Sequence, residues 1–342
     1  MKEIKLRMFF DAHCHLRTER ILSNMIPFIA VYASKVIVMP NTRPRAILTG
    51  DDVIWYRNEI QKALRGNKMP FEPLMTIEIR DNTTPQTVEE AKKAGVVAGK
   101  AYPLGVTTNS DEGLRDFFSG EITDTFQAME DIGMLLLIHG ELDGEKILVT
   151  EREKNFIPVL VKLSERFPKL KIVFEHVSTK FGVYMVEQLG ENVAATITVH
   201  HLCLTLNDVI GYGIKPHNAC MPIPKTFEDR DALIEAATSG NPKFFLGSDS
   251  APHFRNKKEC FVGACGIFSA PVVPALLAEI FEKEGRFNRL EAFTSANAAK
   301  FYGQPLSEEK ITLVKKDWVV IEEIDGIVPF MARQKLYWEQ VL

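Results

Sequence analysis

The chain has 342 residues, of which 46% are hydrophobic and 25% charged, and its formal net charge is −4. These fractions are ordinary for a globular protein, so they exclude a disordered, collagen-like or coiled-coil chain. A mildly acidic chain has no basic field for nucleic acid or anionic lipid, and we expect neither as a partner. The longest apolar stretch, 267–281, contains Ser269, Pro271, Pro274 and Glu279 and is too short to span a membrane.

The N-terminus and the cysteines indicate the compartment. The first seven residues, Met1-Lys-Glu-Ile-Lys-Leu-Arg7, contain no apolar core of a signal peptide, so we expect a cytoplasmic protein. The cysteines are odd in number and irregularly spaced, which argues against a disulfide framework. They are Cys14, Cys203, Cys220, Cys260 and Cys265.

A short apolar or β-branched run followed by a longer amphipathic stretch recurs along the chain. The runs predict strands at 8–13, 35–40, 73–78, 96–101, 134–139, 171–176, 193–198 and 243–248. Nearly continuous apolar runs are typical of strands that are buried on both faces of a parallel sheet. Helical patterns lie between them at 51–64, 85–94, 121–132, 151–167 and 226–239.

Eight strand–helix repeats are the number found in a closed (β/α)8 TIM barrel. The main alternative is a doubly wound open sheet, which normally has a glycine-rich phosphate-binding turn after its first strand. Here the first strand ends in His13-Cys14-His15 instead. We therefore predict an α/β fold with a TIM barrel over 1–305 and closing helices at 281–301. A strand-rich C-terminal extension, 306–342, is expected to pack on the barrel without forming an independent domain.

Polar side chains gather where the predicted strands end, and five of the eight histidines lie there. In a TIM barrel these ends form the catalytic face. His13 and His15 point to the same side of an extended strand and can chelate a zinc-like cation. Four further residues follow at spacings of one to three strand–helix units: Lys100, His139, His176 and Asp249. A metal centre explains this joint pattern better than isolated core histidines do.

Lys100 lies in the apolar run 96–102, where desolvation lowers the pKa of its amine. An ammonium group has no lone pair and cannot bind a metal. The neutral amine, however, can add CO2 to form a carbamate, whose two oxygens can bridge two cations. The alternative is a buried lysine paired with a carboxylate, and the surrounding histidines favour the carbamate.

Several motifs follow one another from the first strand to the C-terminal extension. They are Asp11-Ala-His-Cys-His-Leu-Arg17, Val38-Met-Pro-Asn41, Gly99-Lys-Ala-Tyr-Pro103, Thr107-Thr-Asn-Ser110, His139-Gly-Glu141, Phe174-Glu-His-Val-Ser-Thr-Lys180, Lys215-Pro-His217, Cys220-Met-Pro222, Leu246-Gly-Ser-Asp-Ser-Ala-Pro-His253 and Val328-Pro-Phe330. Together they resemble the dihydroorotases of the short, single-domain type in the binuclear amidohydrolase superfamily. The His-x-His and Asp motifs are common to that superfamily, whereas Met-Pro-Asn, Thr-Thr-Asn-Ser and Asp-Ser-Ala-Pro-His are much more specific.

The resemblance implies a centre of two divalent metal ions. His13 and His15 would hold one metal, and His139 and His176 the other. Lys100, as N6-carboxylysine, would bridge both metals, and Asp249 would bind the first metal and move the proton. The family usually contains zinc, which agrees with nitrogen and oxygen ligands, although cobalt or manganese would accept the same set.

The implied reaction is the reversible cyclisation of N-carbamoyl-L-aspartate to L-dihydroorotate and water in pyrimidine synthesis, through a hydroxide shared by the metals. The resemblance assigns the substrate carboxylate to Arg17, Asn41 and His253. It places Thr107 and Thr108 on a mobile loop that closes over the ligand, and main-chain groups of Met221 and Cys265 at the ring amide. Family members are commonly homodimers, which we expect here too.

Two alternative functions remain open at this point. A hydantoinase- or allantoinase-like cyclic amidohydrolase would share the metals but should lack the carboxylate clamp. A non-catalytic homologue acting as a scaffold would normally have lost ligands, and all six positions are intact. The remaining polar candidates are interpreted as supporting or structural residues: Asp11, Glu141, His200, His201 and His217.

Overall fold

The computed structural model describes residues 2–341, and in that part eight parallel strands form one sheet in chain order. The strands are β2 (Phe9–Cys14), β3 (Ala33–Val38), β4 (Glu72–Ile79), β5 (Ala98–Ala101), β6 (Leu135–His139), β7 (Ile172–Glu175), β8 (Val193–Ile197) and β9 (Phe244–Leu246). The sheet closes because Cys14 pairs in parallel with Ser250 and the Asp249 amide donates to the His13 carbonyl at 2.8 Å. The predicted TIM barrel is thus confirmed, and each predicted strand overlaps an observed one.

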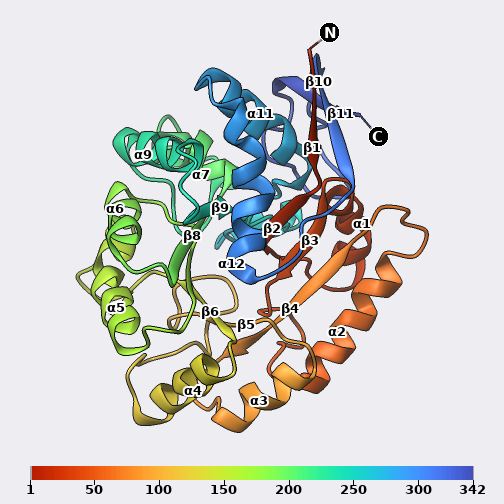
Figure 1. Cartoon of the computed structure of the whole chain (residues 1–342). Helices are drawn as coiled ribbons and strands as arrows, with labels where there is room; N and C mark the ends of the chain where they lie inside the picture. The colour runs from red at the N-terminus through yellow and green to blue at the C-terminus, as the bar shows by residue number, and fades with distance from the viewer. Residues whose placement is uncertain (1, 342) are drawn as a thin grey trace.

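Helices surround the barrel (Figure 1). They are α1 (Glu19–Ala30), α2 (Gly50–Ala63), α3 (Pro85–Lys93), α4 (Gly120–Asp131), α5 (Arg152–Arg166), α6 (Lys180–Gln188), α7 (Val199–Cys203), α8 (Asn207–Ile210), α9 (Phe227–Thr238), α10 (Arg255–Lys258), α11 (Val273–Lys283) and α12 (Asn297–Tyr302). The five predicted helical patterns correspond to α2, α3, α4, α5 and α9. Helices α1 and α6 were not among the predicted patterns, since α1 contains Pro27 and α6 contains Gly182, both poor helix formers.

The closing helices begin earlier than predicted. The prediction placed them at 281–301, whereas α11 already starts at Val273. Pro274 lies in the first turn of α11, where a proline removes no intrahelical hydrogen bond and favours helix initiation. The prolines in the apolar stretch 267–281 therefore mark the start of a helix. Within residues 2–341, no helix has the length and apolarity that a membrane crossing needs.

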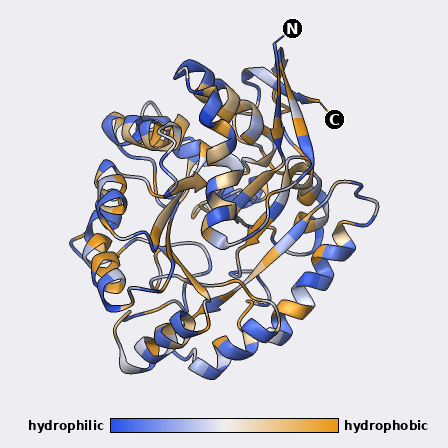
Figure 2. Cartoon of the chain, viewed as in Figure 1, coloured by the Kyte–Doolittle hydropathy of each residue, from blue (hydrophilic) through white to orange (hydrophobic). Residues whose placement is uncertain are grey.

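Local sequence explains why the helices begin where they do and which face they bury. At the start of α2, the Thr49 hydroxyl accepts a hydrogen bond from the Asp52 amide, and the Asp52 carboxylate accepts one from the Thr49 amide at 2.9 Å. This reciprocal capping satisfies amides that would otherwise lack partners. Figure 2 shows that the helices carry hydrophilic and hydrophobic residues on different sides, as expected for elements packed on a sheet.

The N-terminal end of the barrel is filled by apolar side chains. The Tyr302 ring of α12 lies 5.4 Å from the Phe10 ring and 6.1 Å from the Phe245 ring, measured between centroids. Helix α12 crosses the strands at this end and is seen in front of the barrel in Figure 1. Because one end is closed by packing, a polar site can open only at the opposite end, where the strands end.

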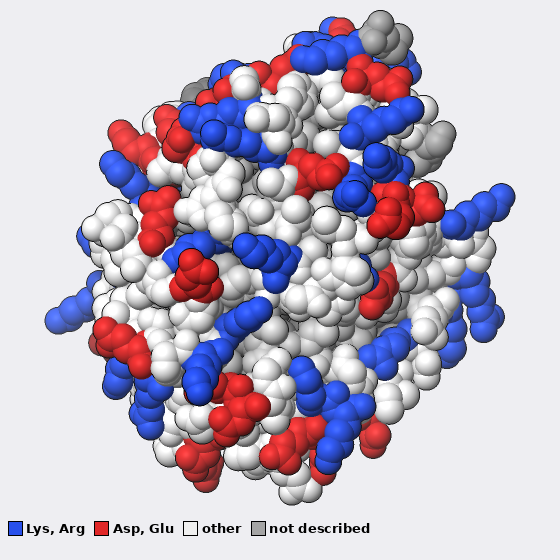
Figure 3. Space-filling view, in the orientation of Figure 1, with Lys and Arg blue, Asp and Glu red and all other residues white. Residues whose placement is uncertain are grey.

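A second, three-stranded antiparallel sheet has the order β1 (Glu3–Arg7), β10 (Lys310–Val319) and β11 (Lys335–Val341). The strands in the C-terminal extension were expected, but the contribution of the N-terminal segment was not. The division at 305/306 stays a prediction, and its end residues Met1 and Leu342 lie outside the described residues. On the face shown in Figure 3, acidic and basic side chains are interspersed, in keeping with the small net charge.

Candidate active site

The end of β2 and the segment after β9 bring three predicted metal ligands together. Asp249 Oδ1 lies 3.2 Å from His15 Nε2 and 3.4 Å from His13 Nε2. The two Nε2 atoms are 3.3 Å apart. Two nitrogens and one carboxylate oxygen therefore face one small space, which is the donor set of a zinc-like cation.

A second pair of donors comes from the ends of β6 and β7. His139 Nδ1 lies 3.1 Å from His176 Nε2, and both side chains are almost fully buried. This pair is next to the first group, because one ligand atom each of His13, His176 and Asp249 lies within 4.8 Å of the other two. The structure thus brings all five predicted histidine and aspartate ligands to one end of the barrel.

Two buried glutamates each contact one of these histidines at the ring nitrogen that faces away from the other predicted ligands. Glu175 Oε2 lies 2.6 Å from His13 Nδ1, and Glu141 Oε2 lies 2.8 Å from His139 Nε2. Thr196 from β8 donates a hydrogen bond to Glu175 at 2.7 Å. In each pair the carboxylate occupies the far ring nitrogen and leaves the near one with its lone pair toward the centre, as in carboxylate–histidine–metal arrangements.

Glu175 and Thr196 are supporting residues to which the sequence analysis gave no role. The available signal was an ionisable residue in an otherwise apolar strand, since Glu175 directly follows Ile172-Val-Phe174. Glu141 had been left open between an acceptor and an ion pair, and the structure places it against His139. Asp11 accepts hydrogen bonds from the Ser248 amide and the Tyr32 hydroxyl, in agreement with an orienting role.

Lys100 is fully buried in β5 beside the histidines. Within residues 2–341, its Nζ atom has no hydrogen-bond partner, so the paired-lysine alternative lacks its carboxylate. Burial lowers the pKa of Lys100 to about 8, although the negative charges of Glu175 and Asp249 act in the opposite direction. The positive charge of Lys100 in turn opposes protonation of His139 and His176. A buried, unpaired amine with a lowered pKa fits the chemistry of carbamate formation.

The ionisation states also fit a cation site. Burial lowers the pKa of His15 to about 3 and holds the pKa values of His139 and His176 below the ordinary value, so these imidazoles keep their lone pairs. Burial opposes ionisation of Asp249, but His13 and His15 hold its pKa below the usual range. The buried His176 Nδ1 has no partner in the described part of the chain. Neutral nitrogens, an anionic oxygen and unpartnered buried atoms are the features that a metal would satisfy.

The backbone at two ligand positions is strained. His176 and Asp249 have φ angles of 42° and 41°, in the left-handed region that side chains rarely adopt. Each follows a barrel strand directly or closely, so the turn re-aims the side chain toward the centre. Gly140, after His139, is required by close packing, because a Cβ atom there would lie 1.8 Å from the Phe174 ring. Strain of this kind is typical of functional sites.

The predicted carboxylate-binding residues lie next to the predicted metal ligands. Arg17 Nη2 is 3.0 Å from His253 Nε2, which in turn is 3.1 Å from the Cys265 carbonyl oxygen. Asn41 Oδ1 is buried and has no partner among residues 2–341. One cavity is lined both by the ligands and by predicted substrate-binding residues: His13, His15, His139, His176 and Asp249, with Arg17, Asn41, Thr107, Thr108, Met221 and Cys265.

The Thr107–Thr108 loop lies over this cavity. The Thr108 hydroxyl donates to the Cys265 carbonyl at 3.1 Å, and the Thr108 carbonyl accepts from Asn41 Nδ2 at 3.0 Å. Asn109 donates back to the Asn41 carbonyl at 2.9 Å. The loop is therefore fastened to two of the predicted substrate-binding positions.

A buried lysine that the sequence analysis did not identify connects two segments of the chain that line this cavity. Lys258 Nζ donates to three main-chain carbonyls, those of Ala219, Ala264 and Gly266, at 3.2, 3.2 and 2.5 Å. These carbonyls belong to the two segments that carry Met221 and Cys265. The available signal was weak, because Lys258 stands in the charged run Arg255-Asn-Lys-Lys258.

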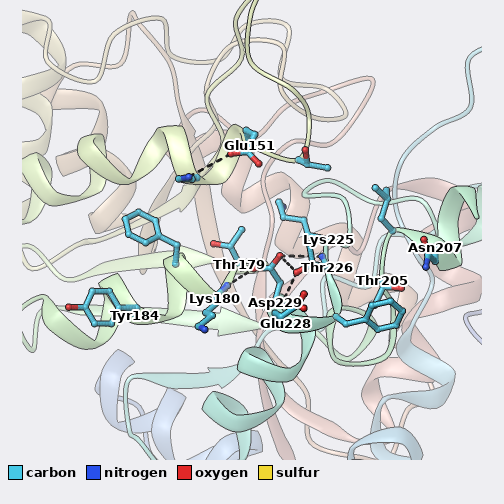
Figure 4. Close-up of a pocket in the computed structure, with 15 residues that line it drawn as sticks. Glu151, Thr179, Lys180, Tyr184, Thr205, Asn207, Lys225, Thr226, Glu228 and Asp229 are labelled. Carbon is cyan, nitrogen blue, oxygen red and sulfur yellow. Dashed lines mark hydrogen bonds and ion pairs between the residues drawn. The ribbon is translucent and has the colours of Figure 1, made fainter.

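Other candidate residues lie apart from the ligand group. His217 Nε2 contacts Glu259 at 2.7 Å at the surface, in agreement with a structural role. A separate cavity lies where α5, α6 and α9 begin, and none of the predicted site residues lines it. Figure 4 shows its polar rim, in which Asp229 accepts hydrogen bonds from the Lys180 amide and from Thr226.

The chain is similar to known proteins over almost its full length. No protein-family model matches it. A curated dihydroorotase of Vibrio cholerae is 43% identical over 334 residues, which cover 96% of both chains. The crystal structure of a Campylobacter jejuni dihydroorotase superposes with a TM-score of 0.92 at 38% identity, covering 100% of this chain and 98% of that one.

A dihydroorotase of Saccharomyces cerevisiae, solved in complex with 5-fluoroorotic acid, superposes with a TM-score of 0.91 at 35% identity, covering 100% of this chain and 99% of that one. Each of these similarities extends over almost the full length of both proteins, which favours the main interpretation over a hydantoinase-like enzyme or a scaffold. The chain therefore belongs to the dihydroorotase family, in the amidohydrolase superfamily.

Proposed function

We propose that the chain interconverts N-carbamoyl-L-aspartate and L-dihydroorotate, closing or hydrolysing a cyclic amide. The observation that carries the proposal is a single cavity that is lined by the five histidine and aspartate residues proposed as metal ligands and also by Arg17 and Asn41, which are proposed to bind a carboxylate. The substrate needs both, since its reacting amide must be polarised while its free carboxylate is held at a fixed distance. The family membership supports the same reaction.

Two divalent cations, which we propose to be zinc, fit the donors present. His13, His15 and Asp249 would hold one, His139 and His176 the other, and carboxylated Lys100 would bridge them. When bound, such cations polarise an amide carbonyl and lower the pKa of water. Glu175 and Glu141 would keep His13 and His139 in the required tautomers.

Asp249 is positioned to move the proton. In the hydrolytic direction its carboxylate accepts a proton from the attacking water, whose oxygen bonds to the ring carbonyl carbon. The ring C–N bond then breaks, and Asp249 returns the proton to the departing nitrogen. In the synthetic direction Asp249 takes a proton from the ureido nitrogen, which attacks the carbon of the protonated side-chain carboxyl group. Asp249 then returns this proton to the departing hydroxyl group, which leaves as water. Because its pKa is held low, Asp249 is ionised at neutral pH, so its carboxylate carries no proton before the reaction begins.

The other side of the cavity orients the substrate. Arg17 can form two parallel hydrogen bonds with the free carboxylate, and Asn41 offers a buried amide group with an unpaired oxygen in the described chain. His253 lies against Arg17, and main-chain groups of Met221 and Cys265 would meet the ring amide. Thr107 and Thr108 would exclude bulk water when their loop closes.

A comparison of two substrates tests this function. Dihydroorotate and hydantoin share a cyclic amide, but only dihydroorotate carries the carboxylate that Arg17 would bind. We expect the metal-loaded protein to hydrolyse dihydroorotate, followed by ultraviolet absorption, with kcat/KM at least about 100-fold higher than for hydantoin. Equal or reversed values would contradict the proposal, and a metal assay on the same sample shows whether two cations are bound.

We further propose that the protein works as a cytoplasmic homodimer, with 1–305 as the barrel and 306–342 as an extension. The support is the family likeness and the packing of the extension on the molecule, where Trp338 of β11 is fully buried and donates to Glu282 at 2.9 Å. Light scattering coupled to size-exclusion chromatography measures the mass, and a monomer at micromolar concentration would contradict the dimer.

A further inference from the structure

His200, the second residue of α7, is buried without a polar partner. Its side chain is fully inaccessible, and within residues 2–341 neither ring nitrogen has a hydrogen-bond partner. Leaving two polar atoms of one imidazole unpaired in the interior is costly, and such atoms in native proteins call for a water or an ion. The proposed reaction makes no use of His200.

Two further metal-binding side chains lie beside it. One ligand atom each of His200, His201 and Cys220 lies within 4.8 Å of the other two, and all three residues are at most 1% exposed. Cys220 Sγ is 3.9 Å from His201 Nε2. Nitrogen and sulfur ligands of a tetrahedral zinc ion are about 3.3–3.6 Å apart, so modest side-chain shifts would bring the donors into coordination.

Two oxygen atoms contact the ring nitrogens of His201. Thr198 Oγ1 lies 2.8 Å from His201 Nδ1, the type of contact that orients a metal-binding imidazole from behind. The Pro222 carbonyl oxygen accepts hydrogen bonds from His201 Nε2 at 2.8 Å and from the Cys220 thiol at 3.3 Å, so all three groups face the same space. A cation would replace these two hydrogens, with the imidazole proton on Nδ1 donated to Thr198 Oγ1 and the carbonyl as a fourth ligand. Burial lowers the pKa of His201 to about 4 and that of His200 well below its ordinary value, which keeps both imidazoles neutral.

We propose that His200, His201 and Cys220 form a third metal site, which binds a thiophilic divalent cation of the zinc class. Two imidazoles and one sulfur suit such a cation and not magnesium or calcium, which require oxygen ligands. Binding releases the proton of the Cys220 thiol. The cation links α7 to the segment that carries Met221, and so stiffens one wall of the substrate cavity. This proposal does not depend on the proposed reaction.

Cobalt titration of the chelator-treated full chain tests the site. We expect a third equivalent of Co²⁺ beyond the two of the main centre, accompanied by a sulfur-to-cobalt charge-transfer absorption in the near ultraviolet. The main centre has no sulfur ligand and cannot give this band. Cys220→Ser should abolish the absorption band and the binding of a third equivalent of Co²⁺. His200→Gln should lower the affinity for the third Co²⁺ about tenfold or more. The matched control is Cys203→Ser, which removes a thiol from α7, the helix that contains His200. This variant should keep both the absorption band and the third equivalent of Co²⁺.

Two outcomes would overturn the proposal. Binding of only two equivalents of Co²⁺, without the sulfur-to-cobalt absorption band, would show that His200 faces only water or empty space. A band that persists in Cys220→Ser would assign the sulfur ligand to a different cysteine. Circular dichroism verifies folding, and should Cys220→Ser not fold, His200→Gln decides, because it keeps the thiol and alters only the imidazole. Loss of dihydroorotate turnover with an intact third equivalent would count against the main centre and not against this site.

Discussion

His13 Nδ1 lies 2.6 Å from Glu175 Oε2, and both side chains are almost fully buried. Burial opposes ionisation of Glu175, but Lys100, His13 and the Thr196 hydroxyl hold its pKa below the ordinary value. The carboxylate is therefore an anion at neutral pH. It fixes the His13 ring so that Nε2 faces Asp249. Glu175 therefore acts on the proposed metal ligands through its contact with His13.

Replacing Glu175 by Gln should weaken metal binding while leaving the fold intact. The amide keeps the shape of the side chain but removes the charge that holds the His13 tautomer, and such changes reduce metal affinity about 10–100-fold. Metal content after dialysis against graded chelator measures the effect. The exposed Glu165→Gln in α5 is the control and should bind metal like the unchanged protein. Unaltered metal affinity in Glu175→Gln would show that His13 needs no such partner.

Lys100→Arg separates the carbamate from a simple buried cation. A guanidinium group keeps the positive charge that a paired lysine would supply, but it does not form a stable carbamate. We expect Lys100→Arg and Lys100→Ala to lose both bound metals and turnover together. Full activity with two bound metals in either variant would rule out the bridging role of Lys100.

The lowered pKa of Lys100 predicts how carbamate formation depends on pH. Burial lowers this pKa to about 8, so the reactive neutral amine becomes abundant between pH 7 and 9, well below the range of an exposed lysine. At constant dissolved ¹³CO2, the carbamate signal of the metal-free protein in ¹³C NMR should rise through a midpoint near pH 8. Lys100→Arg should give no signal at this site. A midpoint near the ordinary lysine value would mean that the amine is hydrated.

Arg17→Met should impair substrate recognition without removing the metals. Two charged hydrogen bonds contribute about 1.5–3 kcal/mol each, so their loss should lower kcat/KM for dihydroorotate about 10²–10⁴-fold. Arg17 is not among the proposed ligands, so the metal content should stay the same. The exposed neighbour Arg20→Met should change kcat/KM little. A normal kcat/KM in Arg17→Met would remove the residue from the clamp.

Lys258→Met tests whether the buried ammonium group positions the two segments that carry Met221 and Cys265. The substitution leaves the carbonyls of Ala219, Ala264 and Gly266 without this donor, which should cost about 1–3 kcal/mol of stability. We expect a higher KM with a smaller change in kcat, because main-chain groups at Met221 and Cys265 lose their support. The exposed Lys257→Met in the same helix should behave like the unchanged protein, and Lys258→Arg should restore part of the loss. A lower melting temperature with unchanged KM would make Lys258 purely structural.

Much of the barrel could be predicted because its information is local. Apolar runs such as Leu135-Leu-Leu-Ile138 are typical of strands that are covered on both faces, and the number of such runs predicts the number of strand–helix units. The ligand candidates followed from position, since His139 and His176 stand directly at the ends of such runs. The start of the helix Val273–Lys283 was missed because prolines conceal its periodicity, and the strand Glu3–Arg7 was missed because it is short.

The sequence by itself determined the order of strands and helices, the end of the barrel that bears polar residues and the set of side chains gathered there. Only the tertiary structure decided that Glu175 contacts His13, that Lys258 joins two distant segments and that His200 lies next to Cys220. These contacts join residues far apart in the chain, or on elements whose relative rotation no local pattern encodes. They arise from the closure of the barrel, which brings separate strand ends to within hydrogen-bonding distance.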